Sequence, residues 1–120
     1  MKNVKIAKLN NLFKLSSKIT VYVPATIDIN KKFDNSKYVD ELASLMSEFF
    51  GGATSCQVLG YWNSPTAGLV KEYTTQVYSY CTDNDLQNHA EKVIDYCINL
   101  KNELKQDAIS LEINGEMYFI

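Results

Sequence analysis

The stretch SKYVDELASLMSEFFGG, residues 36–52, decides the fold class of this chain. Asp34, Asn35 or Ser36 can cap the start of a helix here, and the two glycines can end it because glycine adopts a left-handed conformation at no steric cost. A helix with one apolar stripe has to bury that stripe against another layer. The apolar residues recur at steps of three and four, which places them on one helix face: Val39, Leu42, Ala43, Met46, Phe49 and Phe50.

A second stripe predicts a helix over residues 85–105, and the segments around the two helices alternate like strands. We expect strands over 18–24, 53–62, 69–82, 108–113 and 116–120, the last two joined by Asn114-Gly115, a strong signal for a tight hairpin. This order predicts an α+β fold: a two-layer ferredoxin-like sandwich, with an antiparallel sheet, two helices on one face and a C-terminal hairpin. The second stripe consists of Leu86, Ala90, Val93, Cys97, Leu100 and Leu104.

The predicted domain organisation is an N-terminal arm over residues 1–17 and a single α+β domain over residues 18–120. The arm is lysine-rich with few apolar anchors, so we expect it to pack late or to pair at a sheet edge. Within the sheet, alternation should turn one set of side chains toward the helices: Ile19, Val21, Val23, Tyr73, Val77, Cys81, Ile109, Leu111 and Ile113.

Charge and cysteine content limit the function classes. All 12 basic residues are lysine, and 14 carboxylates give a net charge of −2. Nucleic acid is therefore a poor candidate partner, since its binders carry a basic face and use arginine forks, although lysine can still hold a small phosphorylated ligand. The 3 cysteines fit reduced thiols in a cytoplasm, and no stretch is typical of a secretory signal or a membrane span.

Aromatic residues supply the candidate binding sites. Trp62, at the tip of a predicted hairpin, is either a lid on the core or a stacking surface for a flat ligand or partner, with Tyr61 and Glu72 as its companions. The sheet face turned away from the helices should carry Tyr22, Tyr78 and Tyr80. That face is either solvated or, as we expect, a contact with a ligand or with a second subunit of a homo-oligomer.

Support for catalysis is sparse, and we expect neither a metal nor a cofactor. The cysteines and the single histidine, His89, lack the close pairs that bind zinc. His89 and Cys97 lie about 12 Å apart along a helix, too far for a base and its nucleophile. The favoured interpretation is a non-enzymatic binding protein. The alternative is a small enzyme that uses Glu72 or His89 as general base in a pocket between sheet and helices.

Several short motifs resemble those of a group of small proteins from Firmicutes, their phages and their conjugative elements. These motifs are Phe50-Gly51-Gly52-Ala53-Thr54, Gly60-x-Trp62, Gly68-Leu69-Val70-x-Glu72 and the terminal run from Glu112 to Phe119. The resemblance implies an accessory or anti-defence protein of a mobile element, acting in the cytoplasm of a bacterial host cell. It would work by occluding a host protein or by sequestering a small ligand.

Overall fold

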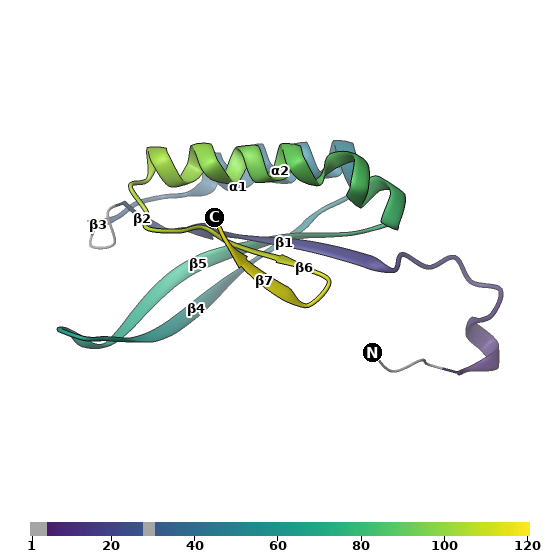
Figure 1. The fold of residues 1–120 in the computed structure, drawn as a ribbon, viewed down its shortest axis with the longest axis horizontal. Coiled ribbons are helices and arrows are strands. Elements are labelled where there is room, and N and C mark those ends of the chain that lie inside the picture. Colours follow the sequence, from purple (N-terminus) through teal and green to yellow (C-terminus); the bar gives the residue numbers. More distant parts are fainter. Residues whose placement is uncertain (1–4, 28–30) are drawn as a thin grey trace.

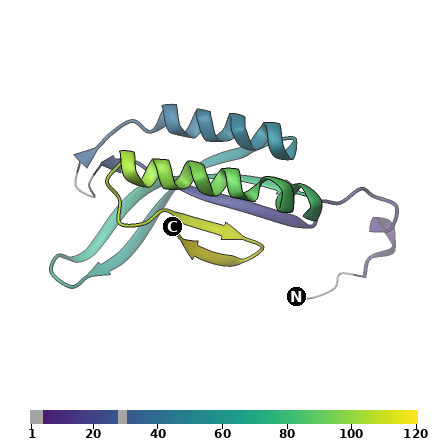
Figure 2. The same cartoon turned by 45° about the horizontal axis from the view of Figure 1, so that its top comes forward.

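Two helices lie side by side on one face of an antiparallel sheet (Figures 1 and 2). The computed structural model describes residues 5–27 and 31–120, so residues 1–4 of the expected arm lie outside it. Within those residues the main sheet has five strands in the order β4-β5-β1-β6-β7. The strands are β1 (Ser17–Pro24), β4 (Thr54–Ser64), β5 (Gly68–Cys81), β6 (Ser110–Ile113) and β7 (Glu116–Phe119). This arrangement confirms the two-layer, ferredoxin-like α+β sandwich.

Local signals explain where the helices α1 (Ser36–Phe50) and α2 (Asp83–Glu103) begin and end. Gly51 takes φ 92° at the end of α1, and its N–H donates to the Ser47 carbonyl at 2.8 Å. At the start of α2, the Thr82 hydroxyl accepts a hydrogen bond from the Asp85 N–H at 3.1 Å. The predicted boundaries are therefore confirmed to within about two residues at most ends.

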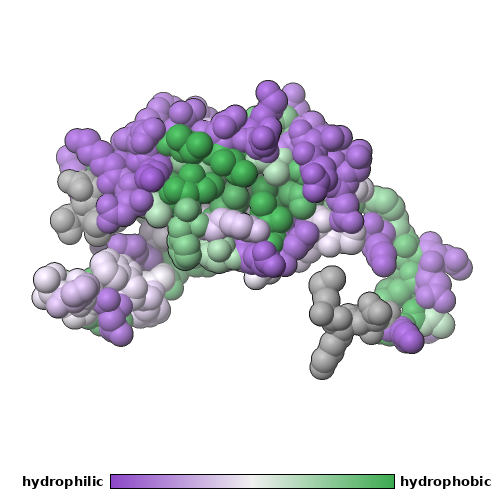
Figure 3. Space-filling view, in the orientation of Figure 1, coloured by the Kyte–Doolittle hydropathy of each residue, from purple (hydrophilic) through white to green (hydrophobic). Residues whose placement is uncertain are grey.

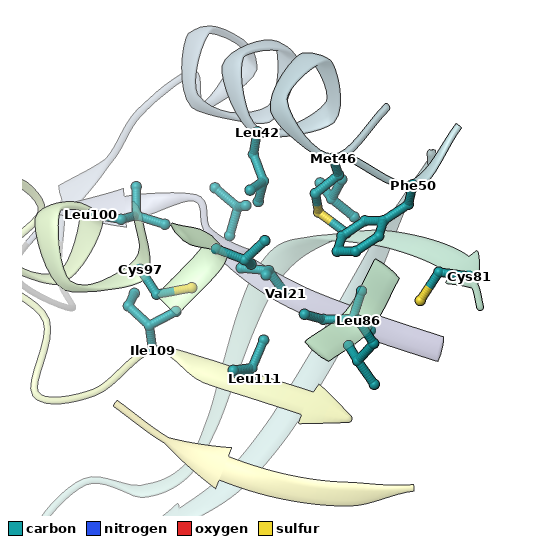
Figure 4. Close-up of a cluster of buried hydrophobic side chains, with 14 of the residues drawn as sticks. Val21, Leu42, Met46, Phe50, Cys81, Leu86, Cys97, Leu100, Ile109 and Leu111 are labelled. Atoms are coloured by element: carbon teal, nitrogen blue, oxygen red, sulfur yellow. The ribbon is translucent and has the colours of Figure 1, made fainter. Parts of the chain in front are cut away.

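The core lies between the sheet and the two helices (Figure 4). The expected inward positions of β1 are fully buried, and Val77, Cys81, Ile109 and Leu111 are buried with them. Tyr73 is the exception: it was expected to face the helices but is 57% exposed. The reason is that the β4–β5 hairpin extends past the ends of the helices, so Tyr73 has no helix to pack against (Figure 1).

The structure also contains elements that the sequence did not predict. Strands β2 (Thr26–Ile27) and β3 (Lys31–Lys32) form a small separate sheet in a stretch for which no helix or strand was predicted. A single 3-10 turn, η1 (Ala7–Leu9), lies in the arm. None of the helices in the described residues is long and apolar enough to cross a membrane.

The sheet face opposite the helices carries a network of side chains. The Tyr22 hydroxyl accepts a hydrogen bond from Gln76 Nε2 at 3.1 Å and donates to Glu112 Oε1 at 3.4 Å. Beside it, Lys18 Nζ lies 4.4 Å from the ring centroid of Tyr78. No helix of the described chain covers this face (Figure 1), so its polar groups pair mainly with one another.

Candidate functional site

A pocket of about 700 Å³ opens between the β4–β5 hairpin and the segment that carries β2 and β3. This volume lies within the range typical of sites for small molecules. The pocket lies where the hairpin leaves the cover of the helices, so its walls come from strands and turns. Its lining residues are Ala25, Thr26, Lys32, Phe33, Trp62, Ser64, Thr66, Ala67, Val70, Lys71, Glu72 and Tyr73.

Strand register brings Trp62 and Glu72 together in this pocket. Glu72 pairs with Gly60, and Trp62 pairs with Val70, so the two side chains are diagonal neighbours on one face of the hairpin. Because Gly60 has no side chain, the space across the strand from Glu72 stays open. Trp62 is 41% exposed, which excludes its role as a lid on the core and leaves the indole available for stacking.

Residues from outside the hairpin complete the pocket. Phe33 follows β3 and contributes a second aromatic surface, with its ring packed edge-on against Tyr38 at a centroid distance of 6.1 Å. Lys32 supplies a cation from β3. Lys71 and Tyr73 also line the pocket, but they alternate with Glu72 along β5, and Lys71 Nζ lies beside the Tyr61 ring. The pocket thus offers flat rings for a planar ligand, the Glu72 carboxylate for a positive group and the Lys32 ammonium for an anionic one. Lys32 and Phe33 were not among the residues predicted from the sequence.

The other predicted site residues lie elsewhere. Tyr61 points away from the pocket lining, is 59% exposed and has Lys71 Nζ 5.9 Å from its ring centroid. Tyr22 belongs to the hydrogen-bonded network on the uncovered sheet face. Tyr78 and Tyr80 pack edge to face at 6.0 Å and line a different hollow, near the arm. The six candidate residues therefore do not form one site.

His89, the other candidate for a general base, lies outside the pocket. Its ring stacks on Phe49 at 4.5 Å with an interplanar angle of 3°, and it does not line the pocket of Trp62 and Glu72. That pocket also does not lie between the sheet and the helices, where a catalytic base was expected. Glu72 is therefore the only one of the two proposed bases that lines this pocket. Among residues 5–27 and 31–120, no group of three or more His, Cys, Asp and Glu side chains is arranged to hold a metal ion.

No protein-family model and no curated protein sequence matches the chain. Solved structures do match it. One is a phage SAM lyase in complex with S-methyl-5'-thioadenosine, at 17% sequence identity and a TM-score of 0.63, covering 93% of this chain and 94% of the other. A phage SAM lyase in the apo state matches at 16% identity and a TM-score of 0.61, covering 88% of each chain. At these identities the likeness establishes the fold.

These neighbours correct one expectation from the sequence. The favoured interpretation, a non-enzymatic binding protein, is wrong by this comparison, because the structures that share the fold over nearly the whole chain are those of an enzyme. The alternative, a small enzyme, is the better supported. The neighbours do not bear on the resemblance to the Firmicutes group, which stays a prediction.

Proposed function

We propose that this chain is an enzyme that cleaves a sulfonium compound of the S-adenosylmethionine (SAM) type and releases S-methyl-5'-thioadenosine. One observation carries the proposal: the pocket sets an exposed indole, Trp62, beside a carboxylate, Glu72, on a fold shared with phage SAM lyase. An indole stacks well on a purine ring, and a carboxylate attracts the positive charges of the sulfonium and the amino group.

The bond that breaks joins the sulfur to the γ carbon of the amino acid part. The electron pair of that bond goes to sulfur, which turns the sulfonium cation into a neutral thioether. A carboxylate that only neutralises the sulfonium would stabilise the reactant more than the transition state, because the positive charge disappears as the bond breaks. Glu72 is therefore expected to take up a proton or to hold the substrate's ammonium group.

The second product identifies which of these roles Glu72 has. If Glu72 acts as general base, it removes a proton from the β carbon, the electrons of that C–H bond form a double bond, and an unsaturated amino acid is released. If Glu72 holds the ammonium, the substrate's own carboxylate can attack the γ carbon, and a lactone is released. Both routes balance without water or an external oxidant.

The cation of the pocket suits the same substrate. Lys32 lines the pocket with Glu72, and its ammonium group can bind the substrate carboxylate. Such an enzyme would consume the cofactor of SAM-dependent enzymes in a bacterial cytoplasm. That activity accords with the anti-defence role implied by the resemblance to proteins of mobile elements.

The test is turnover of SAM by the purified full-length protein, followed by chromatography of both products. We expect Glu72→Gln to lower kcat by roughly 100-fold or more. Binding of S-methyl-5'-thioadenosine, which carries no sulfonium and no ammonium, should change by less than about threefold. Glu112→Gln is the matched control, since Glu112 lies on the same sheet outside the pocket. Failure of the wild type to release the thioether, or full activity of Glu72→Gln, would overturn the proposal.

A further inference from the structure

The N-terminal arm, residues 5–16, exposes apolar side chains that no other described part of the chain covers. Figure 1 shows the arm extending away from the body, and Figure 3 shows apolar side chains along it. Phe13 is 83% exposed and Leu12 is 61% exposed. Between residues 13 and 16 the described chain makes no backbone–backbone hydrogen bond. The arm therefore has both apolar surface and backbone groups without partners among residues 5–27 and 31–120.

A second exposed apolar surface lies at the β7 edge of the sheet. Strand β7 is the last strand of the sheet, so one of its edges is free, and all four of its residues are exposed. Its apolar side chains are Met117, Tyr118 and Phe119, the last 73% exposed. A free edge of this kind readily accepts a further strand.

Charge favours pairing of these two surfaces. The arm contains Lys5, Lys8 and Lys14, and the chain has no carboxylate before Asp28. By contrast, residues 106–120 contain Asp107, Glu112 and Glu116 and no lysine. A cationic apolar arm and an anionic apolar edge are complementary.

The stretch of the arm next to β1 cannot pair with the β7 edge of its own chain. A strand added beyond β7 would lie three strand spacings from β1, or about 14 Å. The four residues before Ser17 span at most about 14 Å when extended, so only Phe13 could reach that position, and residues 14–16 could not. A strand formed by residues 13–16 that pairs with β7 therefore comes from a second copy.

The arm also leaves space for such a strand. Phe13 and Leu15 line an open hollow of about 590 Å³ together with Phe50, Tyr78 and Tyr80. We call this hollow the slot. A short apolar strand is the kind of occupant that such a slot accommodates.

The solvent-accessible area of the single chain is larger than that of a compact monomer, as expected for a subunit of an oligomer. The chain exposes 8407 Å², about 1,800 Å² more than the surface scaling rule gives for a compact monomer of this mass. Its radius of gyration of 16.1 Å likewise exceeds the value of about 13.6 Å expected for 120 residues. A stable interface takes about 800 Å² from each partner, so the surplus is large enough for two such contacts per chain.

We propose that residues 13–16 of one copy add as a strand to the free edge of β7 of a second copy, whose apolar side chains fill the slot. The contact joins two different surfaces, so it forms a reciprocal dimer or a closed ring. This inference goes beyond the proposed enzymatic function and does not rest on it, because the slot and the pocket of Glu72 share no residue.

Light scattering coupled to size-exclusion chromatography, over 1 to 100 µM protein, tests the assembly. We expect the wild type to associate, and Phe13→Ser and Phe119→Ser each to raise the dissociation constant by about tenfold or more. Leu69→Ser is the matched control, because Leu69 is 60% exposed at the far hairpin and should leave association unchanged. Circular dichroism confirms that each variant folds, and either of the two variants suffices for the comparison. A monomeric wild type, or association that survives both substitutions, would overturn the proposal.

Disulfide trapping between two different variants tests the register. With Cys56→Ser as background, Lys14→Cys and Tyr118→Cys are prepared as separate proteins and mixed under mild oxidation. A mixed dimer is expected from this pair, and none from Lys14→Cys mixed with Thr66→Cys, a residue of the far turn. Equal yields from the two mixtures would show that the arm does not pair with β7.

Discussion

At the scale of single residues, the three cysteines occupy different environments. Cys56 is exposed and its thiol donates to Gln76 Oε1 at 3.3 Å, whereas Cys81 and Cys97 are buried. Burial raises the pKa of the Cys97 thiol from 9.0 to about 12, since a thiolate there would lose its hydration. The folded protein therefore retains a proton on Cys97 under alkaline conditions in which the unfolded chain releases it.

This difference makes stability depend on pH. Because the folded pKa is raised, the contribution of Cys97 is fully present below about pH 9 and is lost as pH rises from about 9 toward 12. At pH 10.5 the loss is about 2 kcal/mol in the free energy of unfolding. We expect Cys97→Ala to lose about 2 kcal/mol less than the wild type between pH 8 and pH 10.5. Urea denaturation at the two pH values measures this, with Cys56→Ala as control. Identical losses in the wild type and in Cys97→Ala would contradict it.

At the scale of elements, the two glycines after α1 have different roles. Gly51 has a positive φ of 92°, whereas Gly52 does not take a left-handed conformation, and neither would meet another atom within 4 Å if it carried a Cβ. The difference between them is therefore conformational and not steric. We expect Gly51→Ala to lower the free energy of unfolding by about 1 kcal/mol or more, because a left-handed alanine is strained. Gly52→Ala should change it by less than about 0.5 kcal/mol. Thermal or urea unfolding of the two variants measures the difference, and equal effects would contradict this assignment.

The sequence predicts those elements whose signals are local. The helix stripes, the Gly51 stop and the Asn114-Gly115 turn depend on neighbouring residues, and the observed elements agree with them. Strands β2 and β3 have only two residues each, which is too short for an alternating pattern of apolar and polar residues to be recognised. Likewise, Tyr73 follows the correct alternation, but how far the helices reach along the sheet is a tertiary property.

The candidate site was predicted only in part, for the same reason. Trp62 and Glu72 share a hairpin, so sequence proximity and strand pairing were enough to associate them. Lys32 and Phe33 lie about 30 to 40 positions away and reach the pocket only through the course of the chain after β1. In the sequence they stand out only as lysines and one aromatic residue between two predicted elements. That pattern by itself does not indicate a pocket.

At the scale of the whole molecule, the core and the pocket lie at different places along the sheet. The core is the part that α1 and α2 cover (Figure 4). The pocket is lined by the β4–β5 hairpin, which extends beyond the ends of the helices (Figure 1). Leu42, a fully buried residue of α1, lines no part of the pocket. Trp62 has the opposite character, since it lines the pocket and is not part of the core cluster. Stability and ligand binding should therefore respond to different substitutions.

Two variants test this separation. Leu42→Ala should lower the free energy of unfolding by about 2–5 kcal/mol, because it leaves a cavity in a close-packed core. The fraction that stays folded should bind S-methyl-5'-thioadenosine within about threefold of the wild type, since no pocket atom is removed. Trp62→Ala should change the free energy of unfolding by less than about 1 kcal/mol but weaken binding of the same ligand by about tenfold, through the loss of stacking. Calorimetric titration at 15 °C and urea denaturation measure the two effects on each variant. If Trp62→Ala destabilised the fold as much as Leu42→Ala, the indole would be a structural residue of the hairpin and not a ligand contact.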